Sequence, residues 1–399
     1  MNEPWTELIS LRNLFDAASR AAEGKKSRPD VALFRANLEP ELFRLRRQLA
    51  DGSYRPGRHH TFRIADPKPR LISAAPFRDR VVHHALTNVL EPVFERRFIP
   101  WSFACRKGLG THKALALARR ACARYSCVLK LDVRKYFPSI DHRILMDLLA
   151  RVVRCPDTLR LIEIIVESSH PESSHPESSH PESSHPESSY PESSYPESSY
   201  PESSYPESSY PESSHSPNDA LQYFPGDTLF TPLERRRGLP LGNQTSQFFA
   251  NVYLNPMDHM IVRNLRPGVY ARYVDDFLLF SDSREELNEM HLRIGEFLDR
   301  YRLTLHPGKS RVYRCRDGFP FLGFRLFPTH ARLARPNVMR FRRRLRQLHA
   351  DYHSGLIDKA TVNQSVQAWI GHAMHGDTWR LREQIFEALP FLAGVRRAV

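Results

Sequence analysis

The N-terminal part of the chain repeats its apolar residues at the spacing of an amphipathic helix. These residues are Leu8, Leu11, Leu14 and Phe15, followed by Leu38, Leu42, Leu45 and Leu49. Because side chains three and four positions apart share one face of a helix, the pattern predicts helices over residues 1–60.

The spacing of the apolar residues changes in the next segment, residues 61–127. Two short runs, Thr61 to Ile64 and Arg70 to Ser73, are typical of strands. A helical pattern returns from Val81 to Leu90. We therefore expect a small strand pair followed by a helix.

The C-terminal residues 333–399 combine a helical pattern with many cations. Phe341, Leu345 and Leu348 form an apolar stripe, while Arg and Lys cover the other face. We expect a basic helical segment here.

Acidic residues interrupt the strand-like runs in the middle of the chain. The runs Tyr270 to Val274 and Phe277 to Phe280 predict two strands, with Asp275 and Asp276 as the tight turn between them. Another apolar run ends at Asp132. An isolated Asp-Asp pair would be better explained as a solvated hairpin turn. Three carboxylates on neighbouring strand ends, however, suit two divalent ions, the usual device for stabilising a phosphoryl transfer.

A low-complexity tract separates these acidic segments. From Glu167, the pentad Glu-Ser-Ser-His-Pro occurs four times and Glu-Ser-Ser-Tyr-Pro five times, ending at Pro211. A proline every five residues forbids helix, and the tract has almost no apolar content, so we predict a disordered loop with some polyproline character. Its histidines favour a tolerated repeat expansion over a metal site, because His gives way to Tyr without other change. Deletion of residues 167–211 is expected to leave activity within a few-fold.

Composition narrows the class of protein. The 399 residues are enough for two or three subdomains, and no apolar run approaches the roughly 18 residues of a membrane span. The N-terminus lacks a secretory pattern. The five cysteines are scattered and odd in number, which favours reduced thiols in the cytoplasm and disfavours zinc.

The net charge of +13 hides a contrast between the tract and the rest of the chain. Residues 167–216 contain ten Glu and no other charged residue, so the remainder carries +23. Arginines cluster at Arg235 to Arg237 and from Arg340 to Arg346. Such a basic body indicates a polyanionic partner, with nucleic acid as the default.

A glycine-rich segment from Gly238 to Gln247 precedes a helical run from Phe248 to Leu254. A loop of this kind lets backbone amides and the positive end of a helix approach a nucleotide or its phosphates. Alone it would be an ordinary glycine turn.

The order of these segments resembles a known family. Asp132 with Phe137, the Gly238–Gln247 segment, Tyr273-Val274-Asp275-Asp276, His306 to Ser310 and Phe321 to Gly323 follow the order of reverse transcriptase motifs A to E. Upstream, Asp66 to Ile72 and Asp79 to Val82 resemble the fingers motifs of that family. Apart from the tract, the resemblance covers roughly residues 60 to 330 and is to prokaryotic reverse transcriptases akin to group II intron enzymes.

This resemblance implies an α+β right-hand polymerase with fingers, a palm built on a ferredoxin-like antiparallel sheet plus helices, and a helical thumb. The implied boundaries are an N-terminal helical extension (1–60), fingers (61–127), the first part of the palm (128–166), the pentad insertion (167–216), the second part of the palm (217–332) and a basic helical thumb (333–399).

The same resemblance implies roles for the acidic residues. Asp132 and Asp275 would ligate two Mg²⁺ ions, with the Val133 carbonyl assisting and Asp276 completing the cluster; Mn²⁺ can substitute. Mg²⁺ prefers carboxylate and phosphate oxygens. Lys309 resembles the lysine that acts as a general acid for pyrophosphate departure.

Further residues would bind the nucleotide. Phe137 resembles the steric gate that excludes a 2′-hydroxyl and favours dNTPs, although a core Phe is an alternative. Lys68 and Arg70 would clamp the triphosphate, or else be solvated loop charges. Gly242 and Gln247 belong to the segment that contacts the templating pair.

Two segments would bind the nucleic acid. The turn Phe321, Leu322 and Gly323 would hold the primer terminus. The basic helix, with Arg342 and Arg343, would contact the backbone of the hybrid duplex without reading sequence. The partners implied are a template RNA, a DNA or RNA primer and dNTPs, with no membrane.

The subclass is suggested by motif B. Most families carry Gln-Gly-x-x-x-Ser-Pro, whereas this chain has Leu241-Gly242-Asn243-Gln244-Thr245-Ser246-Gln247. Leu241 replaces the leading Gln and Gln247 replaces the final Pro, and in both respects the segment resembles that of the enzymes of diversity-generating retroelements. Those enzymes copy a structured RNA with frequent errors at adenines and use a small basic accessory protein. Antiphage-defence and other group II-like enzymes share such a motif and are the alternative.

Two readings from other classes remain. An RNA-templated RNA polymerase would use the same pair of aspartates, but the bulky Phe137 argues against the use of NTPs. A non-catalytic RNA-binding scaffold has no need for a costly carboxylate cluster. The substitution Asp275→Asn separates the scaffold from the enzymes, because a scaffold would keep its activity.

Overall fold

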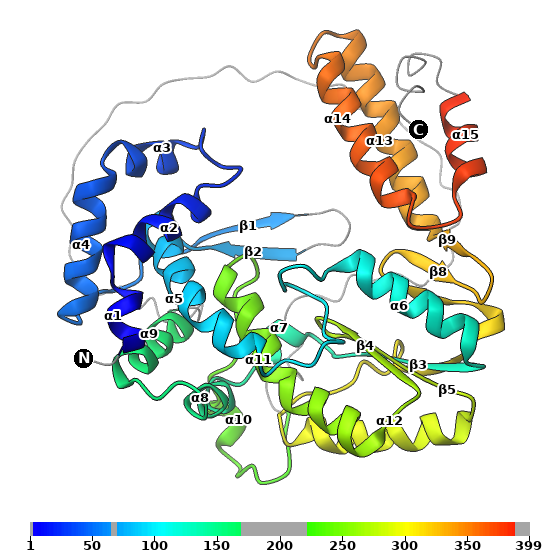
Figure 1. Cartoon of the computed structure of the whole chain (residues 1–399), viewed down its shortest axis with the longest axis horizontal. Coiled ribbons are helices and arrows are strands. Elements are labelled where there is room, and N and C mark those ends of the chain that lie inside the picture. The colour runs from blue at the N-terminus through cyan, green and yellow to red at the C-terminus, as the bar shows by residue number, and fades with distance from the viewer. Residues whose placement is uncertain (1–2, 65–69, 169–221, 388–399) are drawn as a thin grey trace, which may run out of the picture. The chain divides into compact units, whose positions relative to one another are not determined.

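The computed structural model describes residues 3–64, 70–168 and 222–387 (Figure 1). The chain divides into two compact units, Met1–His170 together with Arg236–Val399, and Pro171–Arg235. In the second unit, the description includes the short helix α10 (Thr231–Glu234). Lys68 and nearly all of the pentad tract lie outside the described residues, so the predictions made for them stay predictions.

Four helices form the N-terminal segment, as the apolar spacing predicts. They are α1 (Glu3–Leu8), α2 (Leu11–Ala21), α3 (Pro29–Ala36) and α4 (Leu38–Ala50). The Ser10 side chain caps α2 by accepting a hydrogen bond from the Asn13 amide. The buried face of α2 packs against the long helix α5 (Phe77–Glu95). Phe15 differs from the other predicted apolar positions, since it is exposed.

A two-stranded hairpin and two long helices follow. The hairpin consists of β1 (His60–Ile64) and β2 (Arg70–Ala74), in antiparallel register. Helix α5 extends beyond the predicted Val81–Leu90 at both ends and tolerates Pro92 in its last turn. Helix α6 (Thr111–Arg124) leads into the central sheet. The predicted strand pair and helix are therefore confirmed.

The central sheet has four antiparallel strands in the order β4–β5–β3–β6. They are β3 (Cys127–Asp132), β4 (Val269–Tyr273), β5 (Asp276–Ser281) and β6 (Arg311–Arg314). The predicted turn shifts by one residue. Because Asp276 pairs with Tyr273 across the β4–β5 hairpin, the two-residue turn is Val274-Asp275 and Asp276 belongs to the strand.

Both faces of this sheet are covered. Phe277 and Leu279 of β5 join a core with α11 (Gln244–Met260) and α12 (Arg284–Asp299), whereas Leu278 and Phe280 join a second core with α6. Figure 1 shows α6 and α12 on opposite sides of the strands. Alternate strand side chains point to opposite faces, so burial on both sides explains why β5 is a continuous apolar run.

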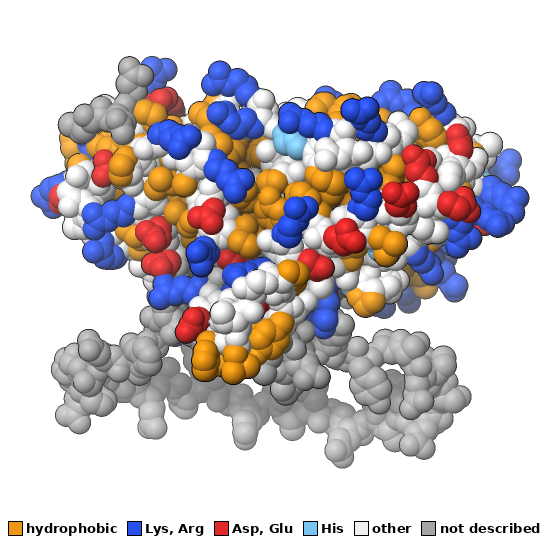
Figure 2. Space-filling view, turned by 90° about the horizontal axis from the view of Figure 1, so that it is seen from below, with side chains coloured by type: hydrophobic (Ala, Val, Ile, Leu, Met, Phe, Trp, Pro, Cys, Tyr) orange, Lys and Arg blue, Asp and Glu red, His pale blue; other side chains and the backbone are white. Residues whose placement is uncertain are grey.

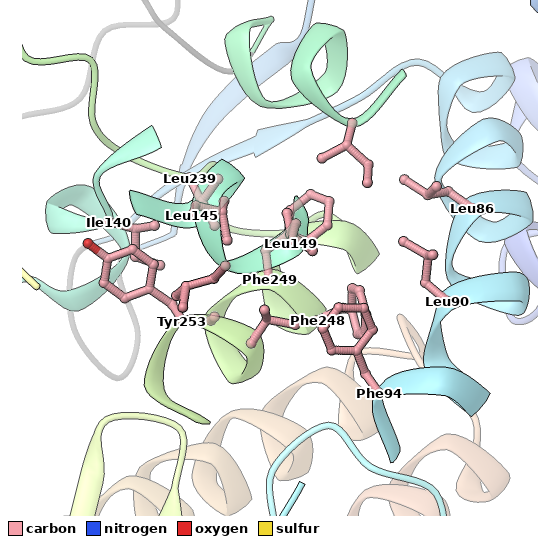
Figure 3. Packing of buried hydrophobic residues seen from close by; sticks show 14 of the residues in the cluster. Leu86, Leu90, Phe94, Ile140, Leu145, Leu149, Leu239, Phe248, Phe249 and Tyr253 are labelled. Carbon is pink, nitrogen blue, oxygen red and sulfur yellow. The ribbon is translucent and has the colours of Figure 1, made fainter. Parts of the chain in front are cut away.

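Three more helices complete the region around the sheet. They are α7 (Tyr136–Ser139), α8 (His142–Ala150) and α9 (Pro156–Glu167), and a π-helical turn (Ile261–Leu265) extends α11. Figure 3 shows side chains of α5, α8 and α11 pointing toward one another. Phe94 of α5 meets Phe248 of α11 edge to face at 5.3 Å. This packing holds the start of α11 against the C-terminal part of α5, where the Gln244 side chain also donates a hydrogen bond to Glu91.

The two sides of the predicted insertion meet in the first unit. Helix α9 includes Glu167, the first residue of the tract, since proline first appears at Pro171 and nothing before it opposes helix. The Glu167 carboxylate forms an ion pair with Arg236, where the chain returns. The Arg236 carbonyl in turn accepts a hydrogen bond from the His142 amide, at 3.0 Å. Departure and return points therefore lie side by side.

The C-terminal part contains a small sheet and three helices. After a short 3₁₀ turn (Cys315–Asp317), the strands are β7 (Phe319–Phe321), β8 (Phe324–Leu326) and β9 (Ala331–Leu333), and the helices are α13 (Arg335–His353), α14 (Lys359–Ala373) and α15 (Trp379–Glu387). The predicted apolar stripe of α13 is confirmed, because Phe341, Leu345 and Leu348 are buried. Phe341 stacks on Trp369 of α14 at 3.8 Å.

The described part of the chain is thus a mixture of helices and antiparallel sheets, as expected for an α+β protein. None of the helices within it is long and apolar enough to cross a membrane.

Candidate functional site

Three acidic residues converge at one end of the central sheet. Asp132 is the last residue of β3 and lies directly opposite Asp276, the first residue of β5. Asp275 precedes it in the turn, and its carbonyl accepts a hydrogen bond from the Val133 amide at 3.4 Å. The predicted convergence of Asp132, Asp275 and Asp276 therefore holds at the level of the backbone.

The turn that carries Asp275 has an unusual backbone. Val274 has a φ of +58°, in the left-handed region that β-branched residues disfavour. Two-residue hairpin turns require such positive angles, because their twist must match that of the strands. The conformation at Val274 is therefore dictated by the hairpin and is opposed by the residue type.

The Asp275 carboxyl group is electrostatically strained. Burial, together with the neighbouring Asp276 and Asp132, raises its pKa to about 6, while Lys309 acts in the opposite direction. A raised pKa is the expected result of placing like charges in a partly desolvated position.

Two lysines balance the other carboxylates. The Lys130 ammonium group lies 2.8 Å from Asp276, and that of Lys309 lies 3.2 Å from Asp132. Lys309 was a predicted site residue, whereas Lys130 was missed. Its signal is its position two residues before Asp132, which places both side chains on one face of β3.

The donor set suits a hard cation, because carboxylate and carbonyl oxygens are the ligands that Mg²⁺ prefers. The elevated pKa of Asp275 also marks repulsion that a divalent cation would relieve. Still, no group of three or more His, Cys, Asp or Glu residues that could hold a metal ion occurs in residues 3–64, 70–168 and 222–387. The metal roles of Asp132, Val133, Asp275 and Asp276 therefore remain a prediction.

Phe137 lies just past the carboxylates, in the short helix α7. It is half-buried, packs against the main core and meets Tyr136 edge to face at 5.6 Å. Its carbonyl accepts a hydrogen bond from the Leu239 amide, which links α7 to the glycine-rich segment. Part of the ring serves the core, and part remains accessible.

The glycine-rich segment contacts the β1–β2 hairpin. The Ser73 amide donates to the Leu241 carbonyl at 3.0 Å, and the Ala75 amide donates to the Asn243 side chain at 3.2 Å. Gly242 has a φ of +114°, and a Cβ there would lie 3.0 Å from Ile72. A side chain at position 242 would thus be strained in its backbone and crowded against the hairpin.

Of the other residues predicted to contact the nucleotide, the structure describes Gln247 and Arg70 but not Lys68. Helix α11 begins at Gln244 rather than Phe248, so Gln247 lies exposed in its first turn. Arg70 opens β2 opposite Ile64. Lys68 lies outside the described residues.

The predicted primer-binding turn joins β7 to β8. Phe321 is buried, so a contact of this turn with nucleic acid has to come from Leu322 and Gly323, whose φ angles are +45° and +85°. Arg342 and Arg343 lie exposed on α13. Their roles are not tested by this arrangement.

Comparison with known proteins identifies a domain within the chain. Residues 203–326 match the family described as Reverse transcriptase (RNA-dependent DNA polymerase). The matched segment includes Asp275, Asp276 and Lys309, whereas Asp132 lies on the other side of the tract. The chain therefore contains a segment that is similar to reverse transcriptases.

Curated relatives agree with this assignment. Nuclear intron maturase 1, mitochondrial, of Arabidopsis thaliana is 38% identical over 87 residues, which are 22% of this chain and 12% of that protein. Nuclear intron maturase 2, mitochondrial, of the same plant is 30% identical over 151 residues, 34% of this chain and 20% of that protein. Protein YkfC of Escherichia coli (strain K12) is 22% identical over 347 residues, 77% of this chain and 76% of that protein.

The chain thus spans a small part of the two maturases. The matched segment and these relatives make the chain similar to RNA-dependent DNA polymerases and, in part, to intron maturases.

Proposed function

We propose that this chain is an RNA-directed DNA polymerase that adds dNTPs to the 3′-hydroxyl of a primer. The observation that carries the proposal is the convergence of Asp132, Asp275 and Asp276 at one end of an antiparallel sheet, within or beside a segment that matches reverse transcriptases. Carboxylates so arranged are of little use to a scaffold, because each raises the energetic cost of ionising the next.

In this proposal, Asp132, Asp275 and Asp276, with the Val133 carbonyl, would hold two Mg²⁺ ions. The ions, when bound, neutralise charge on the phosphoryl oxygens and favour an in-line displacement. The chain's own contribution is to bring Asp275, whose pKa is raised to about 6, next to Asp132 and Asp276, where a bound cation would favour its ionised form. Lys309, whose ammonium group lies beside Asp132, would give a proton to the departing pyrophosphate.

In this proposal, the surrounding elements correspond to the palm, fingers and thumb subdomains of a polymerase. The central sheet with α11 and α12 is the palm, the β1–β2 hairpin with α5 belongs to the fingers, and α13 with α14 and α15 is the thumb. Phe137 gates the sugar, and the Leu241–Gln247 segment meets the templating pair. Contacts between Ser73 and Leu241 support a shared nucleotide site between hairpin and loop.

We propose further that the enzyme serves a diversity-generating retroelement and works with a small basic accessory protein. The support is the sequence of the segment Leu241 to Gln247, with Gln247 exposed at the start of α11. The second candidate is another retroelement or intron-related enzyme, which is favoured by the two maturase relatives.

Primer extension tests the polymerase proposal. The full chain, with Mg²⁺, is given poly(rA)/oligo(dT) or a mixed-sequence RNA template, and either dNTPs or NTPs. We expect DNA product from dNTPs, and Asp275→Asn should abolish nearly all of it. The matched control Asp317→Asn, in an exposed turn, should leave synthesis unchanged.

Sequencing the product separates the biological roles. Errors concentrated opposite template adenines would support the diversity-generating assignment, whereas accurate DNA would favour the second candidate. RNA product from NTPs would overturn the central proposal.

A further inference from the structure

A buried arginine lies directly behind the turn that carries Asp275. Arg272, in β4, is fully buried and forms an ion pair with Asp258 of α11, whose side chain is also fully buried. The contact is bidentate, with Nε donating to Oδ1 at 2.7 Å and Nη2 donating to Oδ2 at 2.6 Å. The Tyr270 hydroxyl donates to the same Asp258 carboxylate at 2.7 Å. The guanidinium plane is therefore fixed in place.

The remaining nitrogen of this guanidinium points to the turn. Nη1 donates to the Asn251 side chain at 3.1 Å and to the Val274 carbonyl at 3.0 Å. That carbonyl belongs to the peptide bond between Val274 and Asp275. Because Val274 is held at a φ of +58°, the peptide would relax toward a different orientation without an anchor.

The backbone of Arg272 is anchored as well. Its amide donates to the Trp101 carbonyl, and its carbonyl accepts from the Phe103 amide, both at 2.9 Å. The side chain thus originates from a strand position that is held on two sides and ends at the turn.

A purely structural role explains this arrangement poorly. A buried ion pair contributes little more to stability than an apolar pair of the same volume, because desolvation offsets the attraction. An apolar pair, however, cannot donate a hydrogen bond to the Val274 carbonyl. The feature specific to arginine is its planar fork, which binds the Asp258 carboxylate and the turn at the same time.

We propose that Arg272 is a positioning residue that sets the orientation of the Asp275 carboxylate through the Val274 carbonyl. Asp258 and Tyr270 hold the guanidinium group, and the guanidinium group holds the peptide plane. The inference rests on the proposed polymerase function, since it assigns a purpose to the geometry of Asp275.

The substitution Arg272→Lys tests this role. Lysine keeps the charge beside Asp258, but its single ammonium group cannot reproduce the fork. We expect kcat for nucleotide addition to fall about 10- to 100-fold, as for a small misplacement of a reacting group. The KM for dNTP and the affinity for primer–template should stay within about threefold, because Arg272 lies outside the surfaces that would contact them.

Arg106→Lys is the matched control. Arg106 also pairs with a carboxylate, Glu95, and donates to the carbonyls of Ile99 and Ser102, so it supports the segment that anchors the Arg272 backbone, but its hydrogen bonds do not include the Val274 carbonyl. We expect its thermal midpoint to fall comparably while kcat is retained. A proportional loss of kcat and thermal midpoint in both variants would show that Arg272 is only structural.

A second variant keeps the test informative if Arg272→Lys fails to fold. Tyr270→Phe removes one hydrogen bond to Asp258 and preserves the packed ring, so we expect a several-fold fall in kcat with KM unchanged. Val274→Asn should reduce the dependence on Arg272, because Asn adopts positive φ more readily than Val. Equal effects of Arg272→Lys with and without Val274→Asn would contradict the proposal.

The unsubstituted chain separates the two ideas. If it synthesises no DNA with any template, the proposed function fails. If it polymerises and the Arg272 and Tyr270 variants do so at the same rate, only the positioning role fails.

Discussion

At the scale of single residues, the site is a balance of charges around Asp275. Its two acidic neighbours are each paired with a lysine, whereas Asp275 carries the raised pKa. Such perturbed groups mark functional positions more often than structural ones. The free energy of unfolding should therefore be lowered by the presence of the ionised Asp275 carboxylate.

Asp275→Asn should stabilise the metal-free protein at neutral pH. The folded-state pKa of about 6 lies above the ordinary value of 3.8, so the folded chain holds the proton more tightly than the unfolded chain. Stability then falls as pH rises from about 4 to about 6, and the asparagine variant lacks this fall. We expect a gain of about 3 kcal/mol at pH 7 in the presence of a chelator, measured by denaturant unfolding.

Two comparisons sharpen this test. Adding Mg²⁺ should stabilise the unsubstituted chain but not the Asp275→Asn variant, because only the former offers the full set of oxygen ligands. The exposed control Asp317→Asn should show neither change. If the free energy of unfolding depends on pH in the same way in the unsubstituted chain and in Asp275→Asn, the assignment of the raised pKa to Asp275 is wrong.

Residue-scale prediction from the sequence succeeded for the acidic residues and failed for their partners. Asp132, Asp275 and Asp276 follow apolar runs, and a run that ends in a carboxylate already indicates a strand end. The position of Lys130 two residues before Asp132 puts it on the same face of the strand, but its pairing with Asp276 depends on the register that sets Asp132 opposite Asp276, which the sequence does not show. Arg272 was missed for the same reason, since Asp258 lies on a separate helix.

At the scale of elements, helix starts were harder to predict than strands. The run Phe248 to Leu254 is apolar and buried, and was read as the helix. The first turn from Gln244 to Gln247 mixes polar residues, so its composition is also that of a loop. Only contacts with the β2 hairpin, such as that of Asn243 with Ala75, show where the loop ends.

Helix α13 allows an element-scale prediction. Its apolar stripe is buried against α14, whereas Arg342 and Arg343 are exposed to solvent, where a polyanion can meet them. The double substitution Arg342→Gln and Arg343→Gln should weaken primer–template binding without a change in sequence preference. The slope of log affinity against log salt should shrink by about one for each arginine removed. Fluorescence anisotropy across a salt series measures both.

The matched control for α13 is Arg12→Gln, since Arg12 is an exposed arginine on α2. It should leave the salt slope unchanged if the N-terminal helices lie away from the duplex. An unchanged slope in the α13 variant would remove this helix from the proposed thumb contact.

At the scale of the whole molecule, charge is distributed unevenly. The chain outside residues 167–216 carries +23, and Figure 2 shows Lys and Arg side chains spread over the described face, notably along its upper edge and right-hand end. A body of this charge attracts nucleic acid at long range, whatever the sequence. The acidic tract offsets part of that charge and is expected to weaken nonspecific association, whereas the proposed catalytic residues Asp132, Asp275 and Asp276 all belong to the first unit.

Removing residues 172–211 tests that independence. The variant keeps Glu167 and its partner Arg236, and the return of the chain stays anchored because the Gly238 amide donates to the Ile140 carbonyl. Closing a shorter connection between points that already lie side by side changes the loop entropy by less than about 1 kcal/mol. We therefore expect DNA synthesis within about threefold of the full chain and an unchanged thermal midpoint, measured by primer extension and thermal unfolding. A Gly/Ser replacement of equal length separates the effect of length from that of the eight glutamates within residues 172–211, whose loss alone should strengthen nonspecific RNA binding at low salt. Abolished synthesis in the deletion but not in the replacement would mean that tract length is required, and abolished synthesis in both would mean that the pentads themselves take part in the reaction.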